Sequence, residues 1–591
     1  MDYPAYAGTR QVNRRNIMHI HRIKLDSFRN LNHFEIDFID GIQNPAQEGE
    51  KYLFNSHAII GANGAGKSNL LEAIIMIFRD LDLNNPASLS YEIDYEIRDH
   101  YIQIQSSAGK RPSITIDGKR SSASKISEEA REYLPSNIFV YYSGKNDRIE
   151  QLFQAHQRRF NRRMEITDEE YLPEHYLSDF TGKIDQEKAI NERKKRINQL
   201  RHQLGEDQLR RLFYCRGGHS QLVLLACLLS DDKEFRRLLN DLNILELDSA
   251  LFILKQPYRL RHNLSEKDIL DGDNRFWYAR GEVVSEFLSK LWPLALAPIE
   301  HTENKLIDFR GRTEKQELLY LFLENKNKLK QLGDEVGDAE RFFRYAEAAY
   351  IGDLIDEVRI NVKHKDSKGK VSFSQLSEGE LQLLTVLGLM RITSQDHCLF
   401  LLDEPDTHLN PIWKLRYFDE IQKINQSNKA NTINGSSQII ITTHDPMMIG
   451  SLRREQVRIL RKYKGFSIVE QPDQHPQGMG VTGLLRSELF GLRATVDSET
   501  LRRLDRRNFL FAKDKQRTPP EDAELTKLSD ELSDLGFATA DFKDPYYAMF
   551  VRKMALHTQF HKETLSLEEQ KEQDEIANEI IEEILREQNR Q

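Results

Sequence analysis

Cysteine is scarce in this 591-residue chain, which contains only three. Cys215, Cys227 and Cys398 lie far apart and form no C-x-x-C pair, so neither a disulfide framework nor a zinc ribbon can be built from them. Such usage is typical of the reducing cytosol. We therefore expect a cytoplasmic protein.

Long hydrophobic runs and an excess of positive charge are also missing. The longest uninterrupted apolar stretch, 222–229, is far shorter than the roughly 20 residues that span a bilayer, so we expect no membrane segment. Residues 1–15 carry charge without a following apolar region, which argues against a secretory signal. Lys plus Arg number 84 and Asp plus Glu 93, giving a formal net charge of −9. This excludes a uniformly basic coat for nucleic acid, although a local basic patch stays open.

A glycine-rich loop is the first chemical signal in the chain. The β-prone run 56–60 leads into GANGAGKS at 61–68, and a helical stretch follows at 69–78. The loop fits the pattern G-x-x-x-x-G-K-[ST] in its required context, between a strand and a helix. Its backbone N–H groups can curl around phosphates, while Lys67 supplies a cation and Ser68 a Mg²⁺ ligand. A chance glycine turn is the alternative, and the flanking elements disfavour it.

Two further segments could complete a phosphate-handling site. The apolar strand 399–404 ends in Asp403, which would hold Mg²⁺, and Glu404, which would polarise the attacking water. The segment 376–380, LSEGE, opens a helix where Ser377 and Gly379 could present a hydroxyl and N–H groups to a phosphate. Taken alone, the first would be a solvated acidic turn and the second an ordinary helix cap. Only their combination with the glycine loop predicts a nucleotide site.

The order of these motifs resembles the ABC ATPase superfamily. Walker A at 61–68, the signature at 376–380, Walker B at 399–404, a D-loop at 406–410 and the histidine of the H-loop, His444, follow one another as in that superfamily. The resemblance implies an α/β ABC-type head, with a mixed sheet and a P-loop, that binds ATP and Mg²⁺. It also implies a head-to-tail homodimer or higher oligomer, in which two ATP molecules are sandwiched and the signature acts in trans. For His444, a packed or solvated histidine remains the alternative to a γ-phosphate contact.

The resemblance also assigns roles to individual residues. It implies catalytic roles for Glu404, Lys67 and His444, and metal ligation by Ser68 and Asp403. The implied nucleotide-binding residues are Gly61, Asn63, Gly64, Gly66, Lys67, Ser68, Asn69, Ser377, Gly379 and Glu380.

Other segments narrow the resemblance to one branch. Lys67 and Ser377 are 310 residues apart (377 − 67), too far for a plain nucleotide-binding domain. IKLDSFRN at 23–30 and DEPDTHLNP at 403–411 look like the SMC/RecF/OLD branch. YYSG at 141–144 and GVTGLL at 480–485 are similar to ATPases of restriction and anti-phage defence operons, such as the PtuA type of Septu and retron systems. Two features depart from the superfamily pattern. No Q-loop glutamine can be placed after the expected strand 138–142, and Glu378 stands where transport ATPases carry glycine.

Three functions stay open at this level. The leading hypothesis is a defence ATPase that regulates a separate HNH-type nuclease, since no Asp-x-Asp of a nuclease follows Arg461. The alternatives are a RecF-like DNA-repair ATPase that clamps DNA itself and a slowly hydrolysing scaffold that assembles oligomers. DNA binding is undecided. Paired arginines between 502 and 507 recur at i, i+4, for which a salt-bridged helix face is the preferred interpretation.

The chain is expected to divide into four segments. These are an N-terminal ATPase lobe at 1–147, a mainly helical insertion at 148–350, a C-terminal ATPase lobe at 351–494, and a helical region with an acidic tail at 495–591. Further strands at 101–105, 113–117 and 138–142 are expected to extend the sheet begun by 56–60.

Overall fold

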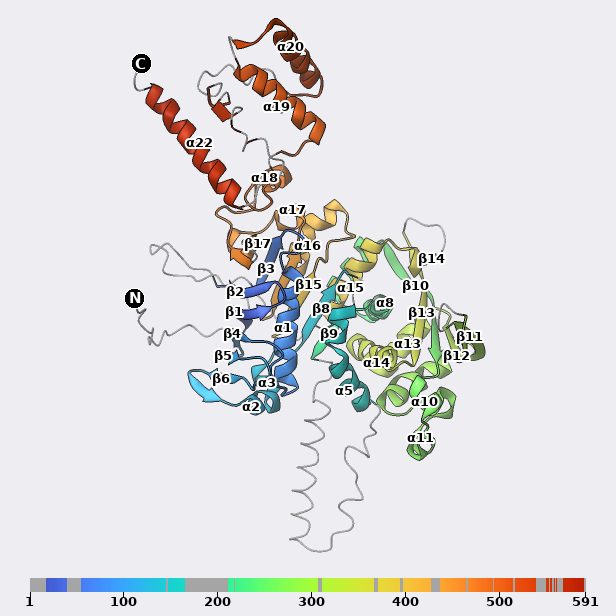
Figure 1. The fold of residues 1–591 in the computed structure, drawn as a ribbon. Coiled ribbons are helices and arrows are strands. Elements are labelled where there is room, and N and C mark those ends of the chain that lie inside the picture. The colour runs from blue at the N-terminus through green and yellow to red at the C-terminus, as the bar shows by residue number, and fades with distance from the viewer. Residues whose placement is uncertain are drawn as a thin grey trace. The chain divides into compact units, whose positions relative to one another are not determined.

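We describe the fold from a computed structural model of the chain (Figure 1). The contacts divide the chain into two compact units, 1–59 with 66–443 and 60–65 with 444–591, and each is described by itself. The residues that the structure describes are 17–39, 55–144, 147–164, 211–216, 218–306, 311–365, 370–393, 397–426, 436–463, 466–492, 494–513, 516–537, 549–551, 553–554, 557, 560 and 567–588.

The first unit begins with an antiparallel sheet in the order β2-β1-β4-β5-β6-β7. The strands β1 (Met18–Phe28) and β2 (Leu31–Asp37) form a hairpin whose turn contains Arg29 at φ 57°. The other strands are β4 (Tyr91–Ile97), β5 (His100–Ser106), β6 (Ser113–Ile116) and β7 (Lys119–Ser121).

The strands expected at 101–105 and 113–117 exist, but they do not extend the P-loop sheet. They are β5 and β6 of this antiparallel sheet. The reason is visible along β5, where buried residues alternate with exposed ones. One face of that strand meets water, whereas a strand of a helix-covered parallel sheet is buried on both faces.

The P-loop sheet is parallel where its central strands pair. Within the first unit its strands follow the order β3 (Ser56–Gly61), β16 (Gln438–Thr443), β15 (Leu399–Asp403), β8 (Ile138–Tyr142) and β9 (Leu212–Tyr214). The strand β15 runs parallel to both β16 and β8, and all five of its residues are buried. Helix α1 (Lys67–Asp82) follows β3 and the glycine loop. Parallel strands bring their carboxyl ends to one edge, where α/β proteins bind their ligands. The expected α/β fold class, with mixed sheets and helical regions, is confirmed.

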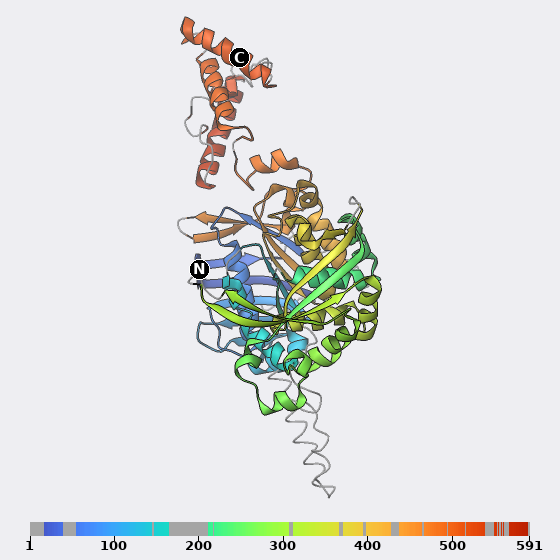
Figure 2. The same cartoon turned by 90° about the vertical axis from the view of Figure 1, so that its right-hand side faces the viewer.

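A second antiparallel sheet takes three of its five strands from the expected insertion, 148–350, and two from the segment that follows it. Its order is β11 (Ile299–Leu306), β12 (Thr313–Leu323), β10 (Ile244–Lys255), β13 (Ile355–His364) and β14 (Lys370–Ser372), and Figure 2 shows these green to yellow strands together. Helices α8 (His219–Leu229), α9 (Lys233–Asp241), α13 (Lys326–Val336) and α14 (Ala339–Ile351) belong to the same region. The rings of Phe252 on β10 and Phe342 on α14 both pack against Phe287, with centroids 6.1 and 5.6 Å away.

The described part of the segment 148–350 contains the strands β9, β10, β11 and β12 as well as helices. Its charged residues obscured the strands: β12 begins TEKQE, and β11 reads IEHTENKL. Those side chains are mostly exposed, as the position of β11 at the edge of its sheet allows. The four-segment division of the chain stays a prediction.

The second unit contains the hairpin β17 (Val457–Tyr463) and β18 (Phe466–Glu470), followed by helices. These are α17 (Pro446–Ile449), α18 (Gly480–Arg486), α19 (Ser498–Ala512), α20 (Pro519–Asp534) and α22 (Leu567–Gln588). Arg506 on α19 makes a bidentate contact to Glu524 on α20, with both N–O distances 2.8 Å, and Arg503 lies 3.7 Å from Glu531. These two arginines therefore belong to a salt-bridged helix pair, as the sequence analysis preferred.

The expectations drawn from the few cysteines and from the short hydrophobic runs can be compared with the described residues. All three cysteines are free and buried, and burial raises the pKa of the Cys215 and Cys227 thiols. No helix in the described part of the chain has both the length and the apolar composition needed to cross a membrane.

Candidate nucleotide-binding site

The glycine loop owes its path to two glycines. Gly66, at φ 111°, caps α1, and a Cβ there would come within 2.6 Å of Leu31 Cδ2. Gly61, at φ 156°, lies so close to the backbone carbonyl of Leu460 that a Cβ would overlap it. Only glycine combines a left-handed φ with such close approach. The turn between them is closed by a 3.0 Å hydrogen bond from Ala65 N to Ala62 O.

Lys67 and the end of β15 meet inside the first unit. The Lys67 side chain is 6% exposed, and its Nζ lies 3.9 Å from Glu404 Oε1. Burial lowers the pKa of Lys67, while the carboxylates of Glu404 and Asp403 oppose that shift. The lysine therefore sits against the Walker B carboxylates, as the sequence analysis expected.

Asp403 is the most enclosed charged group of this cluster. It is 2% exposed and hydrogen-bonds to the hydroxyls of Ser68 and Thr442. Burial raises the pKa of Asp403, and the two hydroxyls and Lys67 counteract that shift. The structure thus brings together Lys67, Ser68, Asp403 and Glu404, although Lys67 and Asp403 are far apart in sequence.

Glu404 has an unusual backbone. Its φ is 48°, in the left-handed region that non-glycine residues rarely adopt, and its N–H donates to Thr442 O at 3.0 Å. Strain of this kind persists where the surrounding structure fixes it, often at functional sites. The side chain remains 30% exposed, so water can reach it.

The first turns of α1 hold a polar cluster that sequence reasoning missed. Asn69 Nδ2 donates to Asn30 Oδ1 at 2.6 Å, and its own Oδ1 accepts from Arg29 and Arg148 at 3.3 and 3.4 Å. One turn further on, Glu72 is 2.5 Å from Arg29 and 3.0 Å from Arg148. A glutamate within the apolar run LLEAIIMIF was the available signal, because buried carboxylates need partners.

The signature residues begin α15 (Glu378–Thr393). The Glu380 carboxylate accepts hydrogen bonds from both Ser377 N and Ser377 Oγ at 2.8 Å, and Ser377 Oγ accepts from Glu380 N at 3.3 Å. This reciprocal arrangement is a capping box. Ser377 thus caps the helix and is exposed at the same time. The contacts of Ser377, Gly379 and Glu380 with a nucleotide held by a second copy stay predictions.

Four expected residues lie in the second unit, among them Gly61, described above. Asn63 and Gly64 are exposed loop residues, and His444 is exposed and directly follows β16. Beside it, Asp445 caps α17 by accepting from Met447 N at 2.8 Å. The nucleotide contacts assigned to Asn63, Gly64 and His444 stay predictions.

The strand that should lead to a Q-loop lies next to Walker B. Tyr142, the last residue of β8, pairs with Asp403 on β15, and Ser143 N donates to Asp403 O at 3.3 Å. Tyr142 and Ser143 thus stand where β8 ends, so no glutamine occupies that position. Burial raises the pKa of the Tyr142 phenol, and Asp403 adds to that shift.

These groups fit ATP and Mg²⁺. Among the described residues no side chain caps the N-terminus of α1, and its first turn holds no acidic residue, as a phosphate site requires. Ser68 and Asp403 offer adjacent oxygen ligands, and Mg²⁺ typically takes one or two protein oxygens with phosphates and waters. In the same described part, no group of three or more His, Cys, Asp or Glu forms a metal cage.

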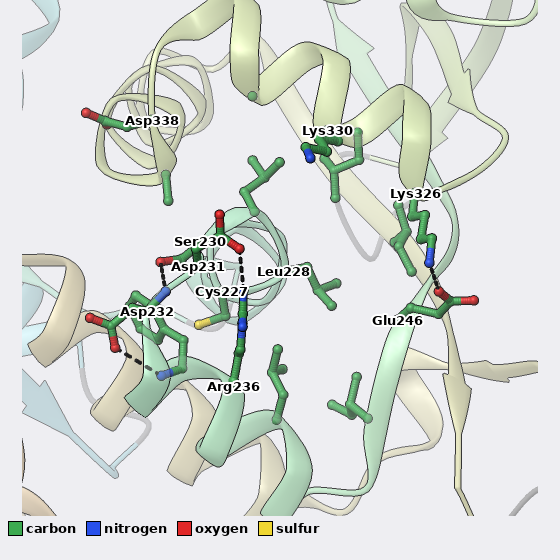
Figure 3. A pocket seen from close by; sticks show the side chains of 18 of the residues that line it. Cys227, Leu228, Ser230, Asp231, Asp232, Arg236, Glu246, Lys326, Lys330 and Asp338 are labelled. Atoms are coloured by element: carbon green, nitrogen blue, oxygen red, sulfur yellow. Dashed lines mark hydrogen bonds and ion pairs between the residues drawn. The ribbon is translucent and has the colours of Figure 1, made fainter.

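A separate groove of about 1030 Å³ lies in the insertion, between α8, α9, β10 and α13 (Figure 3). Ion pairs line its wall, joining Arg236 to Asp231 and Lys326 to Glu246. Its apolar floor includes Cys227 and Leu329. The Walker motifs do not line it, so it is distinct from the nucleotide site.

The fold and this cluster define a P-loop nucleotide-binding protein of the α/β class. The family model described as "AAA ATPase domain" (AAA_15) matches residues 18–449. This chain belongs to that family.

Similar solved structures are more distant. The Smc head domain from Pyrococcus furiosus bound to the C-terminal domain of ScpA is 14% identical, with 77% of this chain and 96% of that chain covered and a TM-score of 0.30. The SMC head domain from Thermotoga maritima is 12% identical, with 76% and 98% covered and a TM-score of 0.28. The recombination mediator RecF of the RecFOR pathway is 13% identical, with 77% and 98% covered and a TM-score of 0.26. Similarities this weak do not define what this chain binds. No curated protein matched the chain.

Proposed function

We propose that this protein binds ATP with Mg²⁺ and hydrolyses it to ADP and phosphate. The observation that carries the proposal is the meeting of Lys67, Ser68, Asp403 and Glu404 at the start of α1 and the end of β15. Membership of the AAA ATPase domain family supports it.

Each residue has a distinct part in this proposal. Lys67 and the N-terminus of α1 bind the phosphates, while Ser68 and Asp403 hold the metal. Bound Mg²⁺ neutralises charge on the phosphate oxygens. Glu404 orients the attacking water and accepts its proton, for which its partly exposed carboxylate is suited. The left-handed backbone of Glu404 fixes the direction of that carboxylate.

Two substitutions test the assignment. Lys67→Ala should abolish nucleotide binding, measured with a fluorescent ATP analogue. Glu404→Gln should bind ATP but hydrolyse it about 10²-fold more slowly, because the amide cannot accept the proton. Glu35→Gln on the exposed side of β2 is the matched control and should turn over normally. Unchanged turnover in Glu404→Gln would remove Glu404 from the water-polarising role.

We also propose that ATP joins two copies through the signature of each chain. The exposed Ser377 at the start of α15 is available to a nucleotide held by a second copy. In Glu404→Gln protein with ATP and Mg²⁺, light scattering coupled to size exclusion should detect a dimer or higher oligomer. Ser377→Arg in that background should return it to the monomer, and persistence of the oligomer would contradict the sandwich.

For the cellular role, we propose an ATPase subunit of a bacterial anti-phage defence system that regulates a separate HNH-type nuclease. Support comes from the sequence resemblance at 141–144 and 480–485 and from the absence of a nuclease motif after Arg461. Tagged Glu404→Gln protein, purified from its native host in ATP and Mg²⁺, should retain a stoichiometric small nuclease. Co-purified DNA and repair factors without a nuclease would favour a RecF-like clamp. Negligible turnover with nucleotide-stable oligomers would favour a scaffold.

A further inference from the structure

The loop that follows Glu404 is held by a buried glutamine on the signature helix. Gln382, one turn into α15, is 6% exposed. Its Nε2 donates to Pro405 O at 2.6 Å, and its Oε1 accepts from His408 N at 3.3 Å. One side chain therefore binds Pro405, the residue bonded to Glu404 and directly before the expected D-loop, and His408 within that loop.

The start of the same helix makes two more contacts with this loop. Gly379 approaches the carbonyl of His408 so closely that a Cβ would overlap it. The His408 ring, through Nδ1, lies 3.1 Å from Glu378 Oε2. On the opposite side, Asp406 is 1% exposed and accepts from Thr443 Oγ1 at 3.1 Å. The loop is thus fixed between the signature helix and the end of β16.

We propose that Gln382 is a positioning residue that couples the signature serine to Glu404 of the same chain. Ser377 caps the start of α15 and Gln382 lies one turn into that helix, so a displacement of Ser377 moves the Gln382 amide with it. That amide is bonded to the peptide oxygen of Pro405, directly after the strained Glu404. When a nucleotide binds Ser377, the Glu404 carboxylate, which orients water at this chain's own site, therefore changes its position.

This inference rests on the proposed ATPase function and adds a regulation to it. A shift of about 1 Å in a catalytic group can cost about 10²-fold in rate without weakening substrate binding. Loss of the Gln382 contacts should accordingly change kcat and leave nucleotide affinity in place. A merely structural role would instead lower protein stability with little selective effect on kcat.

The chain offers a matched control. Gln438 on β16 is also buried, and its amide also bridges two backbone groups: Oε1 accepts from Ile20 N at 2.8 Å and Nε2 donates to Ile20 O at 3.5 Å. Gln438→Leu removes the same chemistry away from the D-loop. Thr385→Val on α15 is a second control, because the Thr385 hydroxyl bonds only within its helix, to Leu381 O.

The experiment compares ATP turnover and ATP affinity of the full-length variants. Gln382→Leu should lose about 10- to 100-fold in kcat, with the Kd for ATP and Mg²⁺ changed by less than about threefold. Gln438→Leu and Thr385→Val should keep kcat within about threefold of the wild type. If Gln382→Leu does not fold, the same-sized Gln382→Glu replaces it, since its carboxylate cannot donate to Pro405 O.

A double variant separates coupling from structure. Because Gln382 acts through Glu404, Gln382→Leu should slow hydrolysis no further when Glu404→Gln is already present. The coupling is overturned if Gln382→Leu lowers kcat in the Glu404→Gln background by the same factor as in the wild type. It is also overturned if the kcat of Gln382→Leu equals that of the controls. Absence of ATP turnover in the wild-type protein would instead refute the proposed function itself.

Discussion

A buried ion cluster anchors the far end of the P-loop helix and yields a quantitative prediction. Asp82, the last residue of α1, is 7% exposed. Its Oδ1 lies 2.8 Å from Arg211 Nε, and its Oδ2 lies 2.8 Å from His156 Nε2 and 3.5 Å from Arg159 Nη1. Burial alone would raise the pKa of Asp82, but the guanidinium groups of Arg211 and Arg159 and the hydrogen bond to His156 together hold it well below its usual range.

Asp82→Asn keeps the shape of the side chain and removes its charge. Arg211 and His156, 5% and 4% exposed, would then stay buried without their carboxylate. Breaking a buried pair from one side costs about 3–5 kcal/mol. If α1 opens locally, the same free energy should accelerate its amide hydrogen exchange roughly 10²- to 10⁴-fold.

Hydrogen exchange with mass spectrometry measures this change on peptides from 67–82. Asp231→Asn is the control, because Asp231 also pairs with an arginine but is 96% exposed. Exposed pairs are worth about 0–1 kcal/mol, so the control should exchange almost as the wild type does. The reasoning is refuted if Asp82→Asn accelerates exchange in α1 no more than Asp231→Asn does. The wild-type contribution of Asp82 is complete above pH 3.8, the ordinary pKa of an aspartate, and is lost as the pH falls through the lower folded-state pKa.

The remaining predictions concern the loop, the signature and the C-terminal helices. Gly66→Ala should weaken ATP binding at least about tenfold, because a Cβ there meets Leu31 at a strained φ of 111°, while Gly109→Ala, at φ 77° with open space around it, should bind normally. Gly379→Ala should lower kcat more than it raises KM, since the added Cβ pushes the signature helix from the His408 carbonyl; equal effects on both would contradict this. Hydrogen bonds from Lys513 and from Thr518 lower the pKa of Glu521 to about 2, so its stabilising effect on α20 should be complete above pH 4.5 and fade as the pH falls through about 2, as NMR titration of the carboxyl would show. A normal pKa at Glu521 would contradict that contact.

Local sequence determined the parts of the site that are contiguous along the chain. The strand, glycine loop and helix at 56–82 follow from β-prone residues, two glycines at forced φ values and an apolar helical run. The end of β15 could also be predicted from local sequence. An uninterrupted apolar strand is buried within a sheet, and the charged Asp403 marks the residue at which this strand ends. Parallel pairing then implies that these two segments meet at one edge.

The sheet to which each strand belongs could not be predicted from the local sequence. The strands β5 and β6 were expected in the P-loop sheet, but they pair with antiparallel partners close in the chain. The strands of the insertion, rich in charged residues, gave no clear period-2 signal. Hydrogen-bond partners are set by which edges are free in three dimensions, and the sequence of one strand does not contain that information.

The sequence by itself determined that this protein has a glycine loop between a strand and a helix, an apolar strand that ends in Asp403 and Glu404, and a helix capped by Ser377. The tertiary structure alone decided that Arg29 and Arg148 converge on Glu72, that two arginines and a histidine surround Asp82, and that Gln382 holds the loop after Glu404. The physical reason is the separation along the chain of the groups that interact. Backbone conformation and capping depend on neighbours within a few residues, whereas a buried polar group takes its partners from wherever the packed chain brings them.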